Sequence, residues 1–411
     1  MATSVRIPVL AVPVLCALAA CDAGIDDPTV TPGREGGVEM VRHGSLAQYG
    51  RPVFAVEHLL AIGVEDGSPE FSFGDVAGLD VMADGTIAIL DGQAGEVRTF
   101  APDGSFLRRI GRKGEGPGEI SGEGALALVA VAPRDFVVPD IMTRTLNVYS
   151  LDGDMVASPR FDIQEMYIPE WRTTGDPLPV VRVSSPGGEV VARYSVLSVE
   201  KSLRDTLAVV ARPAEPVAAD GRQPLWQDHL VWSFSGNVVA AGWMFAPEFT
   251  VHRDGHPVRT VGWDHEDTVL AREEQDAILR IVVRGMGMDD AEIPDGFSDQ
   301  LRIPDRLPAM ADIEVGDDLV LVQRVRPVES MDRRVIYTFK AAGFGGRMWD
   351  AFSSGGEYLG ALDLGAPADV YDIRGDTIVG VRENEAGLQQ VFLARLPGEL
   401  RRDATSAQST P

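Results

Sequence analysis

Residues 79–91 read LDVMADGTIAILD, with apolar and polar side chains alternating on both sides of an Asp-Gly pair. Alternation with a period of two indicates a half-buried strand, and Asp-Gly between two such runs is the strongest short-range signal for a β-hairpin. Residues 96–100 (EVRTF) and 106–111 (FLRRIG) continue the pattern around a second Asp-Gly turn. The stretch 79–111 therefore predicts four short antiparallel strands.

The first of these hairpins recurs along the chain, each time between β-branched or apolar runs. Its turns are at Asp84-Gly85, Arg134-Asp135, Gly187-Gly188, Gly236-Asn237, Asp317-Asp318 and Gly375-Asp376. Measured on the second turn residue, the steps are 50, 53, 49, 81 and 58 residues. A period near 50 residues is typical of stacked supersecondary units. The sequence thus predicts an all-β fold, a six-bladed β-propeller of four-stranded antiparallel blades over residues 51–398.

The last of the six units is short by one strand, since residues 370–396 have room for three. Residues 54–63 (FAVEHLLAIG) form an isolated strand pattern before the first unit and resemble residues 106–111. We expect this N-terminal strand to complete the last blade, which would close the ring and leave no exposed sheet edge.

The step of 81 residues is about 31 residues longer than the first step, which indicates an insertion at residues 266–306. Asp267 is a candidate N-cap for a helix over residues 268–284, and Gly285 would end it. Leu270, Ala277, Ile278 and Ile281 lie on one face of that helix. Packing against the propeller flank is the simpler interpretation, and a lid or partner-docking helix is the alternative.

The N-terminus has the pattern of an export signal. Arg6 precedes an uncharged apolar run, residues 7–20, that ends at Cys21. The run is too short to span a bilayer easily and has the size of a secretory hydrophobic region. Leu18-Ala19-Ala20-Cys21 is similar to a bacterial lipobox, although an ordinary signal peptide with a chance cysteine would look the same.

From this pattern we expect a signal peptide at residues 1–20, lipidation of Cys21 and a flexible tether over residues 21–50. Residues 399–411 are expected to form a disordered tail. The predicted location is exported and lipid-anchored in the bacterial cell envelope.

Residues 110–119 (IGRKGEGPGE) resemble the connector of NHL-like six-bladed propeller proteins, which are common among bacterial lipoproteins. The resemblance covers roughly residues 51–398 and is closest over the first two units. It implies a fold rather than an activity, because propellers support many unrelated functions.

The formal net charge of −25 argues against nucleic acid and bare anionic membrane as partners, since affinity for phosphate requires a basic surface. The membrane is expected as a partner only through the lipid. The other expected partner is an unknown envelope protein, a peptide or a small anionic ligand.

Residues at the ends of the successive second strands are the candidate ligand-binding residues. In a propeller these ends share one face, around the mouth of the central channel. Three arginines and an aromatic side chain there would suit a carboxylate or phosphate ligand. The simpler interpretation is structural, with the two aspartates capping the turns that follow them. The candidates are Asp91, Asp140, Arg193, Trp243, Arg324 and Arg382.

Catalytic chemistry has little support in the sequence. His252, Asp254, His256, Asp264 and His265 could supply metal ligands, but His252 and His256 flank an outer turn. There is no Gly-x-Ser-x-Gly motif. We therefore predict no catalytic residues, no metal ligands and no cofactor; a channel Ca²⁺ or Zn²⁺ is unsupported. The predicted function is non-catalytic binding, and the alternative is a metal-dependent lactonase or lyase-like hydrolase acting at the channel.

Overall fold

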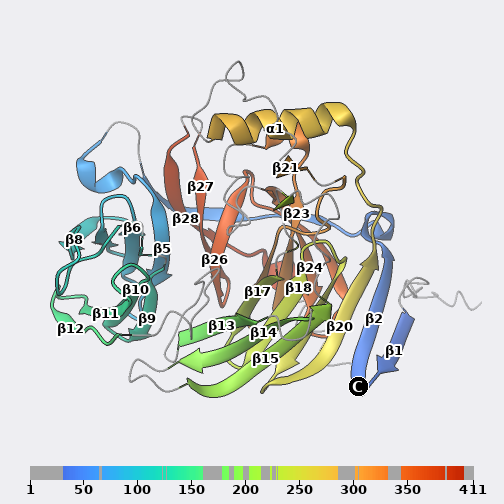
Figure 1. The fold of residues 1–411 in the computed structure, drawn as a ribbon, viewed down its shortest axis with the longest axis horizontal. Coiled ribbons are helices and arrows are strands. Elements are labelled where there is room, and N and C mark those ends of the chain that lie inside the picture. The colour runs from blue at the N-terminus through green and yellow to red at the C-terminus, as the bar shows by residue number, and fades with distance from the viewer. Residues whose placement is uncertain are drawn as a thin grey trace, which may run out of the picture.

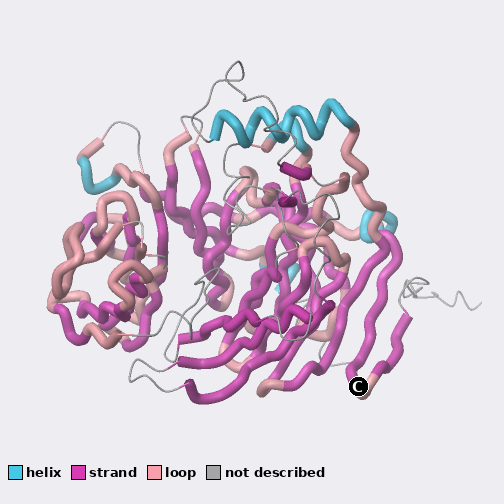
Figure 2. Tube along the Cα trace, viewed as in Figure 1, coloured by secondary structure: helices cyan, strands magenta, loops and turns pink. Residues whose placement is uncertain are grey.

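The computed structural model shows a mostly β-protein in which successive antiparallel sheets follow one another along the chain (Figures 1 and 2). It describes residues 31–63, 67–122, 124–125, 127–160, 178–184, 189–197, 203–213, 223–224, 228, 230–285, 301–303, 305–331, 344–384 and 387–401. The predicted signal peptide, Cys21 and residues 402–411 lie outside these ranges.

The first three sheets are antiparallel and use strands in chain order. The first contains β5 (Val76–Val81), β6 (Ile87–Asp91), β7 (Glu96–Phe100) and β8 (Phe106–Ile110). The second contains β9 (Val129–Ala132), β10 (Asp135–Asp140), β11 (Thr145–Ser150) and β12 (Met155–Ala157). The third is described as β13 (Leu178–Ser184), β14 (Glu189–Leu197) and β15 (Leu203–Pro213).

The remaining three large sheets repeat the same meander. The fourth is built on β17 (Leu230–Ser235), β18 (Val238–Trp243), β19 (Glu248–Arg253) and β20 (His256–Asp264). The fifth is built on β22 (Asp312–Val315), β23 (Leu319–Val325), β24 (Gly345–Ser353) and β25 (Tyr358–Asp363). The sixth contributes β26 (Ala368–Arg374), β27 (Thr377–Glu383) and β28 (Gln389–Arg395). Repeated four-stranded antiparallel sheets of this kind are consistent with a β-propeller.

The N-terminal segment, residues 31–62, adds strands to the last three sheets, and we call it the strap. Strand β2 (Val38–Ser45) pairs in parallel with β20, and β1 (Thr31–Glu35) pairs with β2. Strand β3 (Val53–Ala55) pairs in parallel with β25. The tether predicted over residues 21–50 is therefore wrong for residues 31–49, which form β1, β2 and the 3-10 helix η1 (Leu46–Tyr49).

The sixth sheet receives its fourth strand from the other end of the chain, as expected. Strand β4 (Glu57–Ile62) pairs antiparallel with β28, with Ile62 opposite Val391 and Glu57 opposite Arg395. Only residues 57–62 of the expected strand take part, because Phe54 belongs to β3 on the fifth sheet. The three strands expected within residues 370–396 are also present.

Adjacent sheets bury apolar side chains between them. One core cluster joins the first and second sheets, another the fourth and fifth, and a third the fifth and sixth. A fourth cluster combines β4, β27 and β28 with β5 and β6, so the last and first sheets also share a core. Leu400 is fully buried against the sixth sheet, so the predicted disordered tail cannot begin at residue 399.

The predicted insertion contains helix α1 (Arg272–Gly285), which begins four residues later than expected and ends at Gly285. Figure 1 shows it lying across one end of the sheets. Ile278, Val282 and Val283 are fully buried, and α1 contacts the 3-10 helix η5 (Val328–Ser330). Ile278 and Val282 share a core cluster with side chains of the fourth and fifth sheets, which agrees with packing as the simpler interpretation. Nearby, β16 (Gln223–Pro224) pairs with β21 (Leu301–Arg302).

Among the described residues, no helix has the length and apolar content needed to cross a membrane.

An ion pair between a buried carboxylate and a partly exposed guanidinium connects the last and first sheets. Asp80 on β5 is 1% exposed and accepts a hydrogen bond from the backbone N–H of Ala130 on β9, at 2.7 Å. Arg374 on β26 donates to the Asp80 carboxylate, to the carbonyl of Val81 and to Asp372. Burial raises the pKa of Asp80 to about 7, although the positive charge of Arg374 acts in the opposite direction. One carboxylate thus links three sheets.

Replacing Arg374 with leucine should lower the free energy of unfolding by about 3–5 kcal/mol, because the buried carboxylate of Asp80 loses its cation. The loss should be larger at about pH 8 than at about pH 5. The folded-state pKa of Asp80 is raised to about 7, so its carboxyl is mostly protonated at pH 5 and needs no cation, whereas at pH 8 it is ionised and does. Denaturant unfolding at the two pH values measures both effects.

Arg395→Leu is the matched control, because the ion pairs of Arg395 with Glu57, at 2.8 Å, and Asp376, at 3.6 Å, are exposed. Its loss should cost less than about 1 kcal/mol. Equal losses in the two variants would show that the Asp80–Arg374 pair does not hold the sheets together.

Candidate functional site

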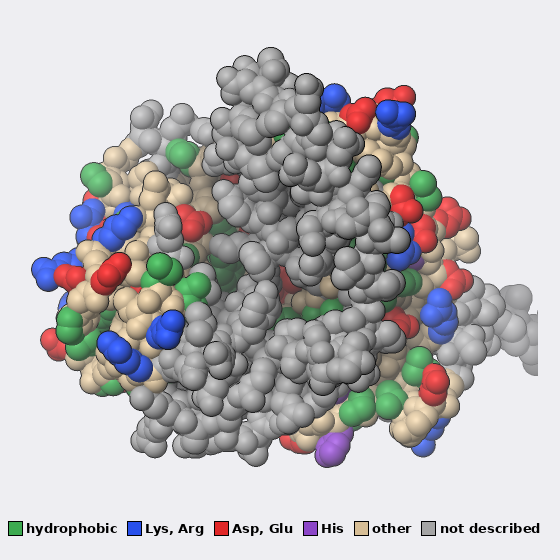
Figure 3. Space-filling model, viewed as in Figure 1, with side chains coloured by type: hydrophobic (Ala, Val, Ile, Leu, Met, Phe, Trp, Pro, Cys, Tyr) green, Lys and Arg blue, Asp and Glu red, His purple; other side chains and the backbone are tan. Residues whose placement is uncertain are grey.

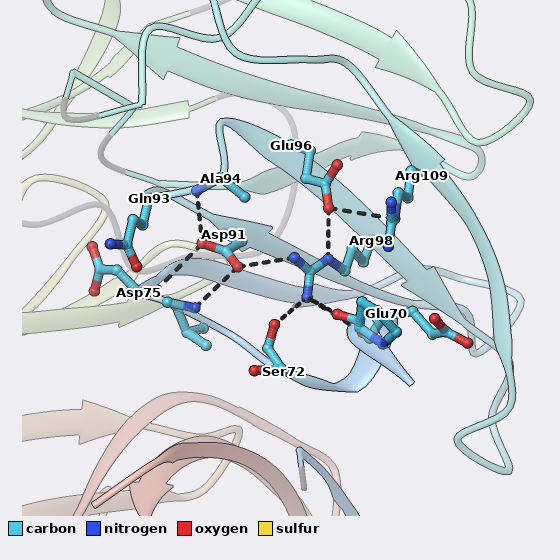
Figure 4. A network of polar contacts seen from close by, with 12 residues as sticks. Glu70, Ser72, Asp75, Asp91, Gln93, Ala94, Glu96, Arg98 and Arg109 are labelled. Carbon is cyan, nitrogen blue, oxygen red and sulfur yellow. Dashed lines mark hydrogen bonds and ion pairs between the residues drawn. The ribbon is translucent and has the colours of Figure 1, made fainter. Parts of the chain in front are cut away.

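The two aspartates predicted at the channel mouth are buried turn caps. Asp91 is 1% exposed, and its carboxylate accepts hydrogen bonds from the backbone N–H groups of Gly74, Asp75 and Ala94 at 3.0–3.4 Å (Figure 4). Asp91 thereby fastens the chain segment that enters the first sheet to the turn that follows β6. These contacts match the simpler, structural interpretation of this residue.

Asp140 occupies the same place in the second sheet and is fully buried. It accepts hydrogen bonds from the backbone N–H and hydroxyl groups of Ser121, both at 2.8 Å, and from the N–H groups of Met142 and Thr143. Both carboxylates therefore use their oxygens to join a connector to a turn.

Arg98 is the centre of the polar network in Figure 4 and was missed by the sequence analysis. Its side chain is buried, pairs with Asp91 at 3.1 Å and Glu96 at 2.7 Å, and lies over the ring of Phe73. It also donates to the carbonyl oxygens of Pro69, Glu70 and Ser72. Arg98 therefore holds the 3-10 helix η2 (Pro69–Phe71) against the first sheet.

The second sheet repeats this contact with a different side chain. Asn147 stands at the position of Arg98 and donates to the carbonyl of Glu119 at 3.4 Å, as Arg98 does to that of Glu70. The likeness of residues 54–63 to residues 106–111 continues into residues 62–71 and 110–120, and this continuation is a sequence signal that could identify the role.

Two of the predicted arginines point along their sheets toward outer strands. Arg324 on β23 makes a two-point ion pair with Asp350 on β24, at 2.6 and 2.9 Å, and this pairing raises the pKa of Arg324. Tyr358 on β25 donates to the same carboxylate at 3.0 Å. The guanidinium charge of Arg324 is therefore matched within the fifth sheet.

Arg382 on β27 likewise reaches outward. It donates to the side-chain carbonyl of Gln390 at 3.0 and 3.2 Å and lies over the ring of Phe392, both on β28. Burial, and then the charge of Arg382, lowers the pKa of His58 on β4. Trp243 ends β18 and is partly buried. Arg193 pairs with Arg182 and Val209 in the third sheet, and its side chain lies outside the described part of the chain.

A pocket of about 550 Å³ lies at the rim of the fourth sheet, and we call it the rim pocket. The strap supplies one wall from the end of β2 and η1, and the segment leaving β20 toward α1 supplies the other. Its lining residues are Arg42, His43, Gly44, Ser45, Gln48, Asp264, His265 and Glu266.

The pocket is lined by buried, hydrogen-bonded groups and by exposed ones. His43 is 1% exposed; its Nε2–H donates to the carbonyl of Gly356 at 2.7 Å, and its Nδ1 lies 3.3 Å from the hydroxyl of Tyr49. Arg42 and Asp264 form a loose, exposed ion pair at 3.6 Å. The Nε2 atom of His265 is buried and has no hydrogen-bond partner among the described residues, which is uncommon for a buried polar atom.

The fold separates the histidines and aspartates that the sequence offered as candidate metal ligands. Asp264 and His265 line the rim pocket, whereas His252 is buried on β19 and His256 is exposed at the start of β20. Within the described ranges, no three His, Cys, Asp or Glu side chains are grouped so that they could hold a metal ion.

Surface charge gives no second candidate site on the face seen in Figure 3. Acidic and basic side chains are interspersed over the coloured part of that face, which therefore shows no patch of a single sign.

No protein-family model matches this sequence, and no curated protein matches it. The chain is similar to a DUF4221 family member from Bacteroides vulgatus at 9% identity, with a TM-score of 0.45 and 83% of this chain and 98% of that one covered. A Bacteroides fragilis protein named for its assumed export has 11% identity, a TM-score of 0.42 and coverages of 87% and 99%. Virginiamycin B lyase from Staphylococcus aureus has 9% identity, a TM-score of 0.35 and coverages of 81% and 88%. These similarities assign neither a family nor an activity to this chain.

Proposed function

We propose that this chain is an exported, lipid-anchored protein of the bacterial cell envelope that binds a small polar ligand in the rim pocket without transforming it. The pocket is the observation that carries this proposal. Its volume of about 550 Å³ falls within the usual range for small-molecule sites, roughly 300–1,000 Å³.

The charges of the pocket suggest the kind of ligand. Asp264 and Glu266 outnumber the single guanidinium of Arg42, and both carboxylates are exposed. Carboxylates accept hydrogen bonds from hydroxyl and ammonium groups, whereas Arg42, Ser45 and Gln48 can donate. A neutral or cationic compound rich in hydroxyl or amino groups therefore fits this pocket better than the small anion expected from the ring of predicted arginines.

The scaffold in this proposal is a six-bladed propeller closed by β4. Six successive sheets, the pairing of β4 with β28 and the apolar core between the last and first sheets support it. A closed ring would also explain why Asp80 contacts the second and sixth sheets simultaneously.

Glucosamine, which carries both hydroxyl and ammonium groups, should raise the melting temperature of the full chain, whereas acetate and citrate should not. A ligand that binds only the folded state, present at a concentration of 100 times its Kd, stabilises that state by about 2.7 kcal/mol. Thermal unfolding across a series of glucosamine, glucose, putrescine and carboxylates measures this effect.

Asp264→Asn should abolish the glucosamine shift, and Asp254→Asn, an exposed change in the β19–β20 turn of the same sheet, should retain it. An equal shift in both variants would place binding outside the rim pocket. A shift with Ca²⁺ or Zn²⁺ that EDTA reverses would favour the metal-dependent hydrolase instead.

Cys21→Ser should move the protein from the membrane fraction to the soluble fraction, because the thiol that carries the lipid is lost. Fractionation of cells that express either form, with Cys16→Ser as the control, measures this. Unchanged membrane association of the Cys21 variant would contradict the lipid anchor.

A further inference from the structure

The strap adds strands to the sheets in two different ways. The fourth and fifth sheets each possess four strands of their own, so β2 and β3 are additional outer strands paired in parallel. The sixth sheet possesses only three, and β4 supplies the missing antiparallel fourth. Removing β4 would expose an incomplete sheet, whereas removing β2 and β3 would leave two complete ones.

The first part of the strap contacts the sheets at their outer edges, where β2 pairs with β20 over six positions. Arg259 on β20 pairs with Glu39 and donates to the carbonyl of Ser354. Val41 and Leu46 are buried at 8% and 9% exposure. Strand β3 has three residues, of which only Phe54 is buried.

The same part of the strap also bridges two sheets. His43 donates to the carbonyl of Gly356, in the turn before β25, and the ring of Tyr49 lies 5.7 Å from that of Tyr358 on β25. Within the strap, the Tyr49 hydroxyl lies 3.3 Å from Nδ1 of His43 and accepts a hydrogen bond from the N–H of Gly44 at 3.2 Å, so β2 and η1 support each other. Val56 alone separates β3 from β4.

We propose that residues 31–55 dock onto and leave the fourth and fifth sheets as one unit, while β4 stays paired with β28. Proteins open locally in cooperative segments whose free energies lie below that of global unfolding. A segment that completes no sheet and ends at a single connecting residue is suited to such opening.

Undocking has two consequences. It removes Arg42, His43, Ser45 and Gln48 from the rim pocket, so the pocket exists only in the docked state. It also releases 25 residues, which span at most roughly 80–90 Å when extended and would lengthen the link to an anchor at Cys21. If the proposed function holds, a ligand in the pocket favours the docked state and keeps this link short, by reciprocal linkage.

Hydrogen exchange of the full chain, followed by mass spectrometry, tests this proposal without any ligand. Amides of β2 and β3 should exchange at least about tenfold faster than those of β20, β25 and β4. Equal protection of β2 and β20, lost only on global unfolding, would overturn the proposal.

Two matched substitutions that shorten buried side chains of the strap make the test more specific. Val41→Ala on β2 should speed exchange of residues 38–45 by about tenfold, which corresponds to 1.4 kcal/mol, and leave the melting temperature unchanged. Ile62→Ala on β4 should lower the melting temperature without speeding exchange in residues 38–45 relative to β20. Similar effects of both changes on the melting temperature would show that residues 31–55 do not open separately.

Glucosamine supplies the separate test of coupling to the pocket. Slower exchange of residues 38–48 in its presence supports the coupling, and a melting shift without slower exchange contradicts it. If glucosamine gives no melting shift, the proposed binding fails, while the exchange pattern of the free protein still decides whether residues 31–55 undock.

Discussion

The sixth sheet has only three strands of its own, and the rest of the structure depends on the strand that completes it. Strand β4 comes from the opposite end of the chain and pairs with β28 along its whole length. Without it, β28 would present a row of unpaired backbone groups to solvent. The pairing also fixes where the chain must enter the first sheet, since β4 is followed directly by the connector that leads to β5.

Buried polar side chains hold that connector in place. Arg98 donates hydrogen bonds to three carbonyl oxygens of residues 69–72, and Asp91 accepts hydrogen bonds from the N–H groups of residues 74 and 75. Burying a charged pair is costly unless its remaining hydrogen-bonding groups are also satisfied. The Arg98–Asp91 pair meets this condition because each partner also binds backbone. The network therefore fixes the geometry of this loop together with Phe71 and Phe73, which pack on the core shared by the last and first sheets.

The parts of the fold that could be predicted are those with local signals. Asp-Gly turns between alternating strands located the hairpins, and the likeness of residues 54–63 to residues 106–111 identified the closing strand. Strands β1 and β2 had no such signal. A parallel outer strand needs no turn, and only part of β2 is buried, so its sequence resembled a solvated tether.

The rim pocket could not have been predicted for a related reason. Its two walls, residues 42–48 and 264–266, are more than 200 positions apart and meet only because β2 pairs with β20. The aspartates predicted at the ends of β6 and β10 were located correctly by the repeat. Their function could not be read from position alone, because turn caps and ligand-binding groups use the same residue type at the same place.

The most direct test of the central claim compares two N-terminal truncations in urea unfolding followed by circular dichroism. A chain that begins at residue 51 retains β3 and β4, and should show a single cooperative transition. A chain that begins at residue 64 lacks the strand that completes the sixth sheet and should show none. Cooperative unfolding of both chains at the same urea concentration would contradict the account, because β4 would then be as dispensable as the strands before it.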